Sequence, residues 1–225
     1  MLSRVQKVID GTTCYYYENK EAGLLLIQPV DAHDLAVLDE EVAIIEKLVG
    51  ESPFSLVAFQ LEDWNQQLSP WEAPAVFGNE AFGAGASDTL DFVTNHLIPA
   101  FGKVQAYYVG GYSLAGLFAL WAAYQTNMFA GAAGVSPSVW FPGWDAHMME
   151  HSMKAEKVYL SLGLKEERTR NQTMAKVGDN IRRQYEILCG DAGVSACTLE
   201  WNPGNHFMDS QLRTAKGFAW LLKKS

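Results

Sequence analysis

Apolar and polar positions along the chain follow two periods, one typical of buried strands and one typical of helices with a single buried face. Short apolar runs predict strands at residues 13–17, 24–28, 54–59, 106–109, 129–135, 158–162 and 197–201. Stretches with helical spacing between them predict helices over residues 35–48, 90–101, 114–124, 174–188 and 212–222. This alternation predicts an α/β fold, with a mostly parallel central sheet and helices on both of its faces.

The predicted helix at residues 114–124 differs from the others because it carries no charged side chain on any face. A helix that is apolar on all sides is a buried helix. The sequence Gly-Gly-Tyr-Ser-Leu-Ala-Gly, residues 110–116, stands between this helix and the strand at 106–109. A polar serine at the entrance to a buried helix therefore needs an explanation.

Ser113 has the surroundings of a nucleophile elbow, a sharp strand-to-helix turn that presents a serine hydroxyl. Such a turn needs small residues two positions before and after the serine, and these are Gly111 and Ala115. Alanine departs from the usual second glycine, but it is the smallest side chain that can replace it. The competing interpretation is a tight turn that is merely marked by glycines. The strand before the serine and the helix after it favour a catalytic nucleophile.

The partners of a nucleophile are expected beyond the carboxyl ends of the parallel strands, where such sheets place their sites. Glu166 and Glu167 follow the strand at 158–162, and His206 follows the last strand. The chain order is serine, acid, histidine. We expect His206 to be the general base for Ser113 and a carboxylate to orient the imidazole.

Alternatives exist for both partners. The other four histidines lie within or beside helical patterns, where surface or capping roles are expected; they are His33, His96, His147 and His151. For the acid, Glu166 is preferred because it is nearer the strand end, and Glu167 stays open. Either glutamate could instead be a charged helix start, where carboxylates favour the helix dipole. Asp209 better suits the N-cap of the last helix.

An oxyanion hole requires backbone N–H groups that point to the developing negative charge. We expect one donor at Leu114, the first residue of the helix after the elbow. The second is expected from the loop after the strand at 54–59, near Gln60 or Leu61. Aromatic residues in the predicted loops could shape a substrate pocket or cap the core, and Trp64 and Trp140 are the preferred pocket residues.

Composition narrows the class of protein. A length of 225 residues predicts one domain, residues 1–225, with a substantial core. The net charge of −9 is scattered, which argues against a nucleic-acid partner. Three widely spaced cysteines indicate neither a disulfide framework nor a zinc site. We expect no metal and no cofactor.

The same sequence gives expectations about location. Residues 1–5 lack the apolar run of a secretory signal, and no uncharged apolar stretch approaches the ~20 residues that span a bilayer. We therefore expect a cytoplasmic protein with no membrane contact.

Several blocks of the sequence resemble a family of esterases that includes esterase D, ferric-enterobactin esterases and feruloyl esterases. The blocks are residues 109–116 around Ser113, Val-Ser-Pro-Ser-Val-Trp at 135–140, Leu-Ser-Leu-Gly-Leu-Lys-Glu-Glu at 160–167, Asp-Trp-Asn at 63–65 with Ser-Pro-Trp at 69–71, and Asn205-His206. The resemblance covers most of the chain from about residue 54 onward. It implies an α/β-hydrolase fold, with Ser113, Glu166 and His206 as the triad, and it places Asn65 beside Trp64 in the substrate loop.

Three functions are compatible with these residues. The first is hydrolysis of small carboxylic esters through an acyl-enzyme on Ser113. The second is acyl transfer or thioester cleavage by the same residues. The third is a catalytically silent binding protein, which is disfavoured because all three triad candidates are present. We expect a small-molecule ester as the substrate.

Overall fold

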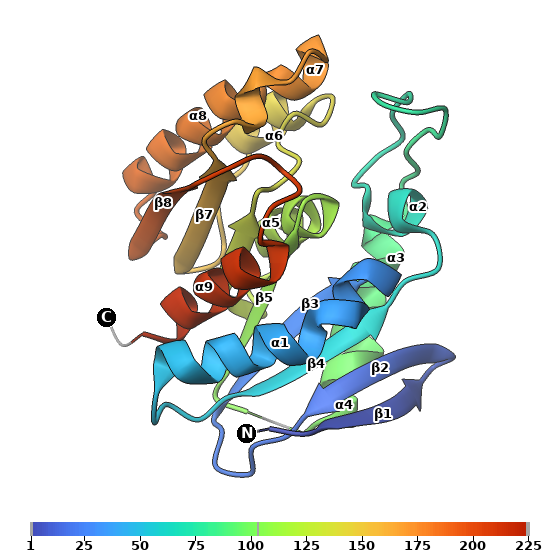
Figure 1. Ribbon diagram of the computed structural model, residues 1–225, viewed down its shortest axis with the longest axis vertical. Coiled ribbons are helices and arrows are strands. Elements are labelled where there is room, and N and C mark those ends of the chain that lie inside the picture. The colour runs from blue at the N-terminus through green and yellow to red at the C-terminus, as the bar shows by residue number, and fades with distance from the viewer. Residues whose placement is uncertain (1, 103, 224–225) are drawn as a thin grey trace.

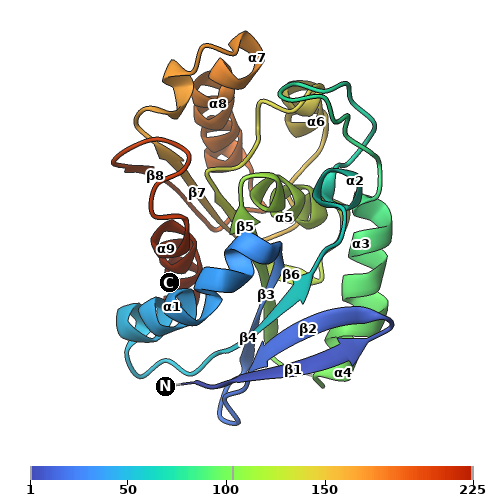
Figure 2. The same cartoon turned by 45° about the vertical axis from the view of Figure 1, so that its right-hand side comes forward.

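The computed structural model describes residues 2–102 and 104–223, and its centre is an eight-stranded sheet with the order β1-β2-β4-β3-β5-β6-β7-β8 (Figure 1). The strands are β1 (Arg4–Ile9), β2 (Thr12–Tyr17), β3 (Leu24–Val30), β4 (Ser55–Gln60), β5 (Ala106–Tyr112), β6 (Phe129–Val135), β7 (Lys157–Gly163) and β8 (Ala196–Asn202). The pairs β1–β2 and β2–β4 are antiparallel, and every later pair is parallel. The antiparallel strands therefore lie at one end of the sheet and β8 at the other (Figure 2).

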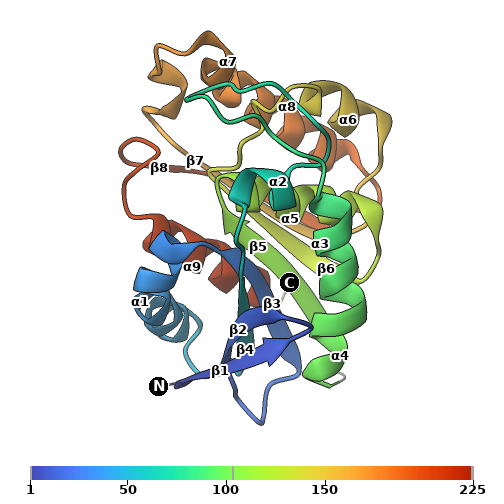
Figure 3. The same cartoon turned by 90° about the vertical axis from the view of Figure 1, so that its right-hand side faces the viewer.

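Helices cover both faces of the sheet. They are α1 (Ala32–Val49), α2 (Trp64–Leu68), α3 (Ala86–Phe92), α4 (Ile98–Ala100), α5 (Leu114–Gln125), α6 (Trp144–Glu150), α7 (Gln172–Ala175), α8 (Val177–Gly190) and α9 (Ser210–Leu222), with a π-helical turn η1 (Val93–Leu97) and a 3-10 turn η2 (Glu166–Arg168). Helices α1 and α9 pack together on one face, and α3 and α5 lie on the other (Figure 3). Each face has its own apolar core.

The hydrophobic pattern explains why the sheet is covered on both sides. All residues of α5 from Leu114 to Tyr124 are buried, as expected for a helix without charged positions. Strands β5 and β6 are buried along most of their length because α5 packs on one face and α9 on the other. The predicted α/β class, with a mostly parallel sheet and helices on both faces, is confirmed.

The structure differs from the sequence-based expectations at four elements. Strand β1 was not expected, because five of its six residues are exposed and its pattern lacks an apolar face. Helices α2 and α6 form in segments where the hydrophobic pattern predicts no helix. In α9, the expected buried position Leu212 is 37% exposed, whereas its neighbour Arg213 is 1% exposed. The other expected positions, Ala215, Phe218 and Leu222, are buried, so the expected face of α9 is confirmed except in its first turn.

None of the helices within residues 2–102 and 104–223 is long and apolar enough to cross a membrane.

Candidate active site

Ser113 stands on a strained turn between β5 and α5. Its φ of 58° and ψ of −119° lie in a region that residues with a side chain rarely adopt. The turn is anchored by the Ser113 N–H, which donates to the carbonyl of Val135 at 3.0 Å. A Cβ on Gly111 would lie 2.6 Å from the Cβ of Ala115, so position 111 has no room for a side chain. This is the steric requirement of the predicted elbow.

His206 and Glu166 meet Ser113 in a continuous chain of hydrogen bonds. The Nε2 of His206 lies 3.0 Å from Ser113 Oγ, and its Nδ1 lies 2.8 Å from Oε2 of Glu166. His206 comes from the loop after β8, and Glu166 begins η2 after β7. The structure thus brings together, at the carboxyl ends of three strands, all three residues predicted as the triad.

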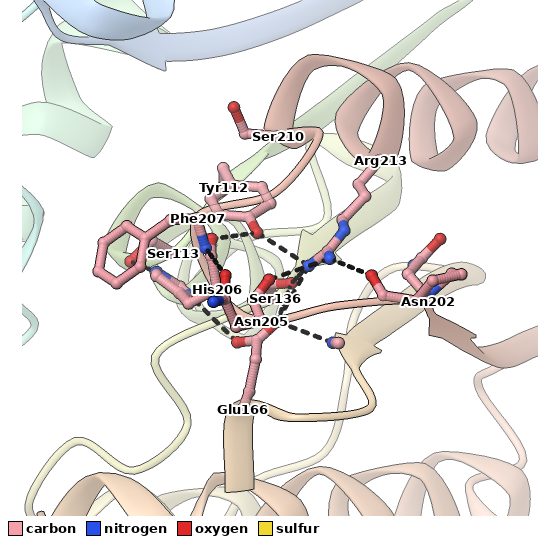
Figure 4. Close-up of polar contacts among 12 residues, drawn as sticks. Tyr112, Ser113, Ser136, Glu166, Asn202, Asn205, His206, Phe207, Ser210 and Arg213 are labelled. Atoms are coloured by element: carbon pink, nitrogen blue, oxygen red, sulfur yellow. Dashed lines mark hydrogen bonds and ion pairs between the residues drawn. The ribbon is translucent and has the colours of Figure 1, made fainter. Parts of the chain in front are cut away.

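The other carboxylate oxygen of Glu166 is held by three donors (Figure 4). Oε1 accepts hydrogen bonds from the Ser136 hydroxyl at 2.8 Å, the Gly163 N–H at 2.7 Å and the Arg213 guanidinium at 3.1 Å. Donors on one oxygen fix the plane of the carboxyl group, so the second oxygen points to His206. Glu166 is 8% exposed, and a buried carboxylate requires such partners.

Glu167, the alternative acid, points elsewhere. Its carboxylate forms an ion pair with Arg182 of α8 at 2.9 Å and lies against Gly178. It therefore joins η2 to α8 and does not contact His206.

Arg213 is the main residue of this cluster that sequence reasoning missed. Besides Glu166, its guanidinium donates to the Tyr112 hydroxyl at 3.1 Å and to the carbonyls of Pro203 at 2.7 Å and Asn205 at 3.0 Å. A charged residue in a helix is ordinarily assigned to the surface. The available signal was its spacing, since Arg213 lies four residues before Gly217 on the buried face of α9.

Three further hydroxyl groups lie beside the predicted triad. Tyr112 donates its hydroxyl to the carbonyl of His206 at 2.7 Å, and burial raises the pKa of this phenol to about 12. Ser138 Oγ lies 3.4 Å from Ser113 Oγ, and the Ser138 N–H donates to the Ser113 carbonyl at 3.0 Å. The Val-Ser-Pro-Ser block after β6 therefore contacts Ser113 through Ser138 and Glu166 through Ser136.

Solved structures resemble this chain over nearly its whole length. An IroE-like serine hydrolase from Shewanella oneidensis is 13% identical with a TM-score of 0.80, and the match covers 98% of this chain and 80% of that chain. The siderophore hydrolase EstB from Aspergillus nidulans is 16% identical with a TM-score of 0.74, covering 97% and 94%. The enterobactin and salmochelin hydrolase IroE is 17% identical with a TM-score of 0.64, covering 98% and 93%. The chain has the α/β-hydrolase fold. No protein-family model matches the sequence, and no curated protein matches it.

In this α/β-hydrolase fold, the two predicted oxyanion donors lie on different elements: Leu114 follows Ser113 directly, whereas Gln60 ends β4, which β3 separates from β5. Leu114 is the first residue of α5, where the first N–H groups of a helix have no acceptor within the helix. Gln60 is the last residue of β4, and its side-chain oxygen accepts the Tyr15 hydroxyl at 3.0 Å. The Leu61 N–H donates to the carbonyl of Val30 at 3.1 Å, so it is used within the sheet.

A pocket of about 200 Å³ opens beside His206 and Glu166. Its apolar lining comes from Trp140, Met174, Val177 and Phe207. Of the three predicted substrate-binding residues, only Trp140 lines this pocket. Trp64 lines a separate, polar hollow together with Gln60, and the carbonyl of Asn65 accepts the hydroxyl of Ser69. The structure therefore does not bring Trp64 and Asn65 to the same pocket as Trp140.

The segment between α2 and α3, residues 69–85, packs its aromatic rings over Trp140. Phe77 and Phe82 each lie 6.0 Å from the Trp140 ring, measured between centroids. The indole N–H of Trp71 donates to the carbonyl of Pro142 at 2.7 Å. These contacts form one apolar wall next to the pocket.

Within residues 2–102 and 104–223, no group of three or more histidine, cysteine, aspartate or glutamate residues could hold a metal ion.

Proposed function

We propose that this protein is a serine hydrolase that cleaves carboxylic esters through an acyl-enzyme on Ser113. The observation that carries the proposal is the hydrogen-bonded sequence from Ser113 Oγ to His206 Nε2, at 3.0 Å, and from His206 Nδ1 to Glu166 Oε2, at 2.8 Å. The strained backbone at Ser113 supports it, because an elbow holds the hydroxyl at the entrance to a helix. The structural neighbours described as serine hydrolase and siderophore hydrolase support the same class of chemistry.

In the proposed reaction, Ser113 Oγ attacks the acyl carbon of the ester, and His206 Nε2 takes the hydroxyl proton. Glu166 accepts the Nδ1–H of His206, which fixes the tautomer and stabilises the imidazolium. The N–H group of Leu114, the first residue of α5, would stabilise the oxyanion. His206 then gives the proton to the departing alkoxide. Water, activated by His206 in the same way, releases the acid and restores Ser113.

The pocket beside His206 supports a substrate with an apolar group next to its ester. Trp140, Met174 and Val177 give this pocket an apolar lining, and the exposed ring of Phe207 stands at its edge. Lys165, Arg168 and Thr169 also line this pocket, so its apolar side chains would hold such a group by burial of surface while polar groups fix its orientation. Acyl transfer and thioester cleavage use the same residues, and no contact among the described residues favours them over hydrolysis.

A fluorophosphonate probe tests the proposal. The folded protein is expected to be labelled on Ser113, as located by peptide mass spectrometry, and to hydrolyse p-nitrophenyl esters. Ser113→Ala should lose both properties, whereas Ser87→Ala, which removes an exposed hydroxyl on α3, should keep both. Label on another serine, or an unlabelled folded protein without esterase activity, would refute the proposal.

A further inference from the structure

The Arg213 side chain is a buried cation at the centre of the site. Its exposed fraction is 1%, and it lies in the first turn of α9, seven residues after His206. Burying a guanidinium is costly unless its N–H groups all find acceptors. Both terminal nitrogens of Arg213 have acceptors, which are two carbonyls, two hydroxyls and one carboxylate oxygen.

These acceptors belong to both halves of the Glu166–His206 pair. On one side, Nη1 donates to Glu166 Oε1 at 3.1 Å, so the guanidinium shares the carboxylate with the imidazole. On the other side, Nη2 donates to the carbonyls of Pro203 and Asn205, the residues that precede His206 in its loop. Nη1 also donates to Tyr112, whose hydroxyl holds the carbonyl of His206 itself.

The loop that carries His206 is also held by the Lys165 N–H, which donates to the carbonyl of Gly204 at 3.0 Å, but it buries little apolar surface. Asn205, Met208 and Asp209 are exposed, and Phe207 is 90% exposed. Gly204 and Asp209 have positive φ values of 91° and 54°, so the loop is not a regular extension of β8 or α9. With so little apolar surface buried, the position of this loop depends on its hydrogen bonds.

We propose that Arg213 is a positioning residue that fixes Glu166 and the His206 loop relative to each other, so that Nε2 of His206 stays within hydrogen-bond distance of Ser113 Oγ. The proposal rests on the proposed hydrolase function, since it assigns a role within that reaction. Arg213 donates from both terminal nitrogens of one planar group, Nη1 toward Glu166 and Nη2 toward the loop. A lysine ammonium offers the same charge from a single point and cannot reproduce the fork.

The test compares Arg213→Met and Arg213→Lys with Lys216→Met. Lys216 is a matched control, because it lies one turn further along α9 and donates to Glu200 at 2.6 Å and Asn202 at 3.0 Å without contacting the triad. For Arg213→Met we expect kcat to fall about 100-fold with KM nearly unchanged, the effect of a small misplacement of a catalytic group. The kcat of Arg213→Lys should lie between that of Arg213→Met and that of the wild type. Lys216→Met should keep the wild-type kcat.

A second readout does not depend on turnover. The Nδ1 proton of His206 is shared with a carboxylate, and such a proton gives a low-field NMR resonance that is lost when the hydrogen bond opens. We expect the resonance in the wild type and in Lys216→Met, and its loss in Arg213→Met. Thermal unfolding of each variant shows how much of any change is global destabilisation.

The outcomes separate this proposal from the proposed function. If the wild type is active and Arg213→Met keeps both its kcat and the resonance, the positioning role is wrong. If the wild type is neither labelled nor active, the hydrolase proposal fails, and loss of the resonance in Arg213→Met alone still supports the positioning role. If Arg213→Met does not fold, Arg213→Lys decides, and a wild-type kcat in that variant overturns the proposal.

Discussion

Two buried glutamates in this protein have opposite surroundings. Glu166, at the carboxyl edge of the sheet, receives hydrogen bonds from His206, Ser136, the Gly163 N–H and Arg213. Glu41, on the inner face of α1, is 3% exposed, and among the described residues its carboxyl group accepts one hydrogen bond, from the side-chain amide of Gln28 at 3.5 Å. Both carboxyl groups are hidden from water, but only Glu166 is surrounded by donors.

The charge state follows from the donors and not from burial alone. Burial raises the pKa of Glu41 well above its ordinary value of 4.5, and the negative charge of Asp34 adds to the effect. Among the described residues, Oε1 of Glu41 and Oε1 of Gln28 have no hydrogen-bond partner. A protonated Glu41 could donate to the Gln28 oxygen, so both orphan atoms are explained by an uncharged acid. Four donors around Glu166 instead suit a carboxylate.

The largest expected effect of a substitution at these glutamates is at Glu166. In Glu166→Gln, the uncharged amide cannot replace the carboxylate that accepts from both Arg213 and His206, and it no longer fixes the His206 tautomer. We therefore expect kcat to fall by roughly 10³–10⁴-fold. The measurement is the hydrolysis rate of an activated p-nitrophenyl ester. Glu41→Gln and Glu167→Gln serve as controls that should keep wild-type kcat. A large loss in Glu167→Gln with normal turnover in Glu166→Gln would reverse the assignment of the acid.

The second-largest expected effect is on the pH dependence of the free energy of unfolding, to which Glu41 contributes. Because its folded-state pKa is raised, Glu41 contributes stability that is fully present below its ordinary pKa of 4.5 and is lost as the pH rises through the folded-state pKa. Glu41→Gln cannot ionise, so this variant should lose less stability than the wild type as the pH increases toward 9. Urea unfolding at a series of pH values measures the difference. Parallel profiles for the two proteins would show that Glu41 is not an uncharged buried acid.

The smallest effect is expected when one donor to Glu166 is removed. Ser136→Ala deletes the 2.8 Å hydrogen bond to Oε1 but leaves Gly163 and Arg213 in place. One hydrogen bond to a charged group contributes about 1.5–3 kcal/mol, and the remaining donors compensate in part, so we expect kcat to fall by roughly 10-fold. Steady-state kinetics measures the change. A loss as large as that of Glu166→Gln would mean that Ser136 acts on the reaction directly.

The sequence predicted the fold and the three residues of the candidate triad because each depends on local signals. The elbow is readable from small residues around Ser113, and His206 from its place after the last strand. The choice between Glu166 and Glu167 depends on side-chain direction in η2, for which chain order supplies only proximity. Arg213 was missed because its acceptors come from four separate segments, and their convergence is a property of the assembled sheet edge.

The pocket residues were harder to predict for a related reason. Trp64 and Trp140 both occur in segments after strands, and composition does not distinguish them. In the folded chain, α2 carries Trp64 toward the polar hollow near Gln60, whereas the turn after β6 places Trp140 under the rings of Phe77 and Phe82. Tertiary packing decides which aromatic ring lines the pocket.

The crowding within the elbow limits how this sequence can evolve. A Cβ at position 111 would stand 2.6 Å from the Cβ of Ala115, which is closer than two carbon atoms can approach without a bond. The methyl group at position 115 is therefore accommodated only because position 111 is glycine. Glycine at position 115 would remove this contact, but the backbone carbon and oxygen of residue 115 would still lie 3.0 and 3.1 Å from a Cβ at position 111. The dependence therefore runs one way: alanine at position 115 requires glycine at position 111, whereas position 111 stays crowded whether position 115 is alanine or glycine.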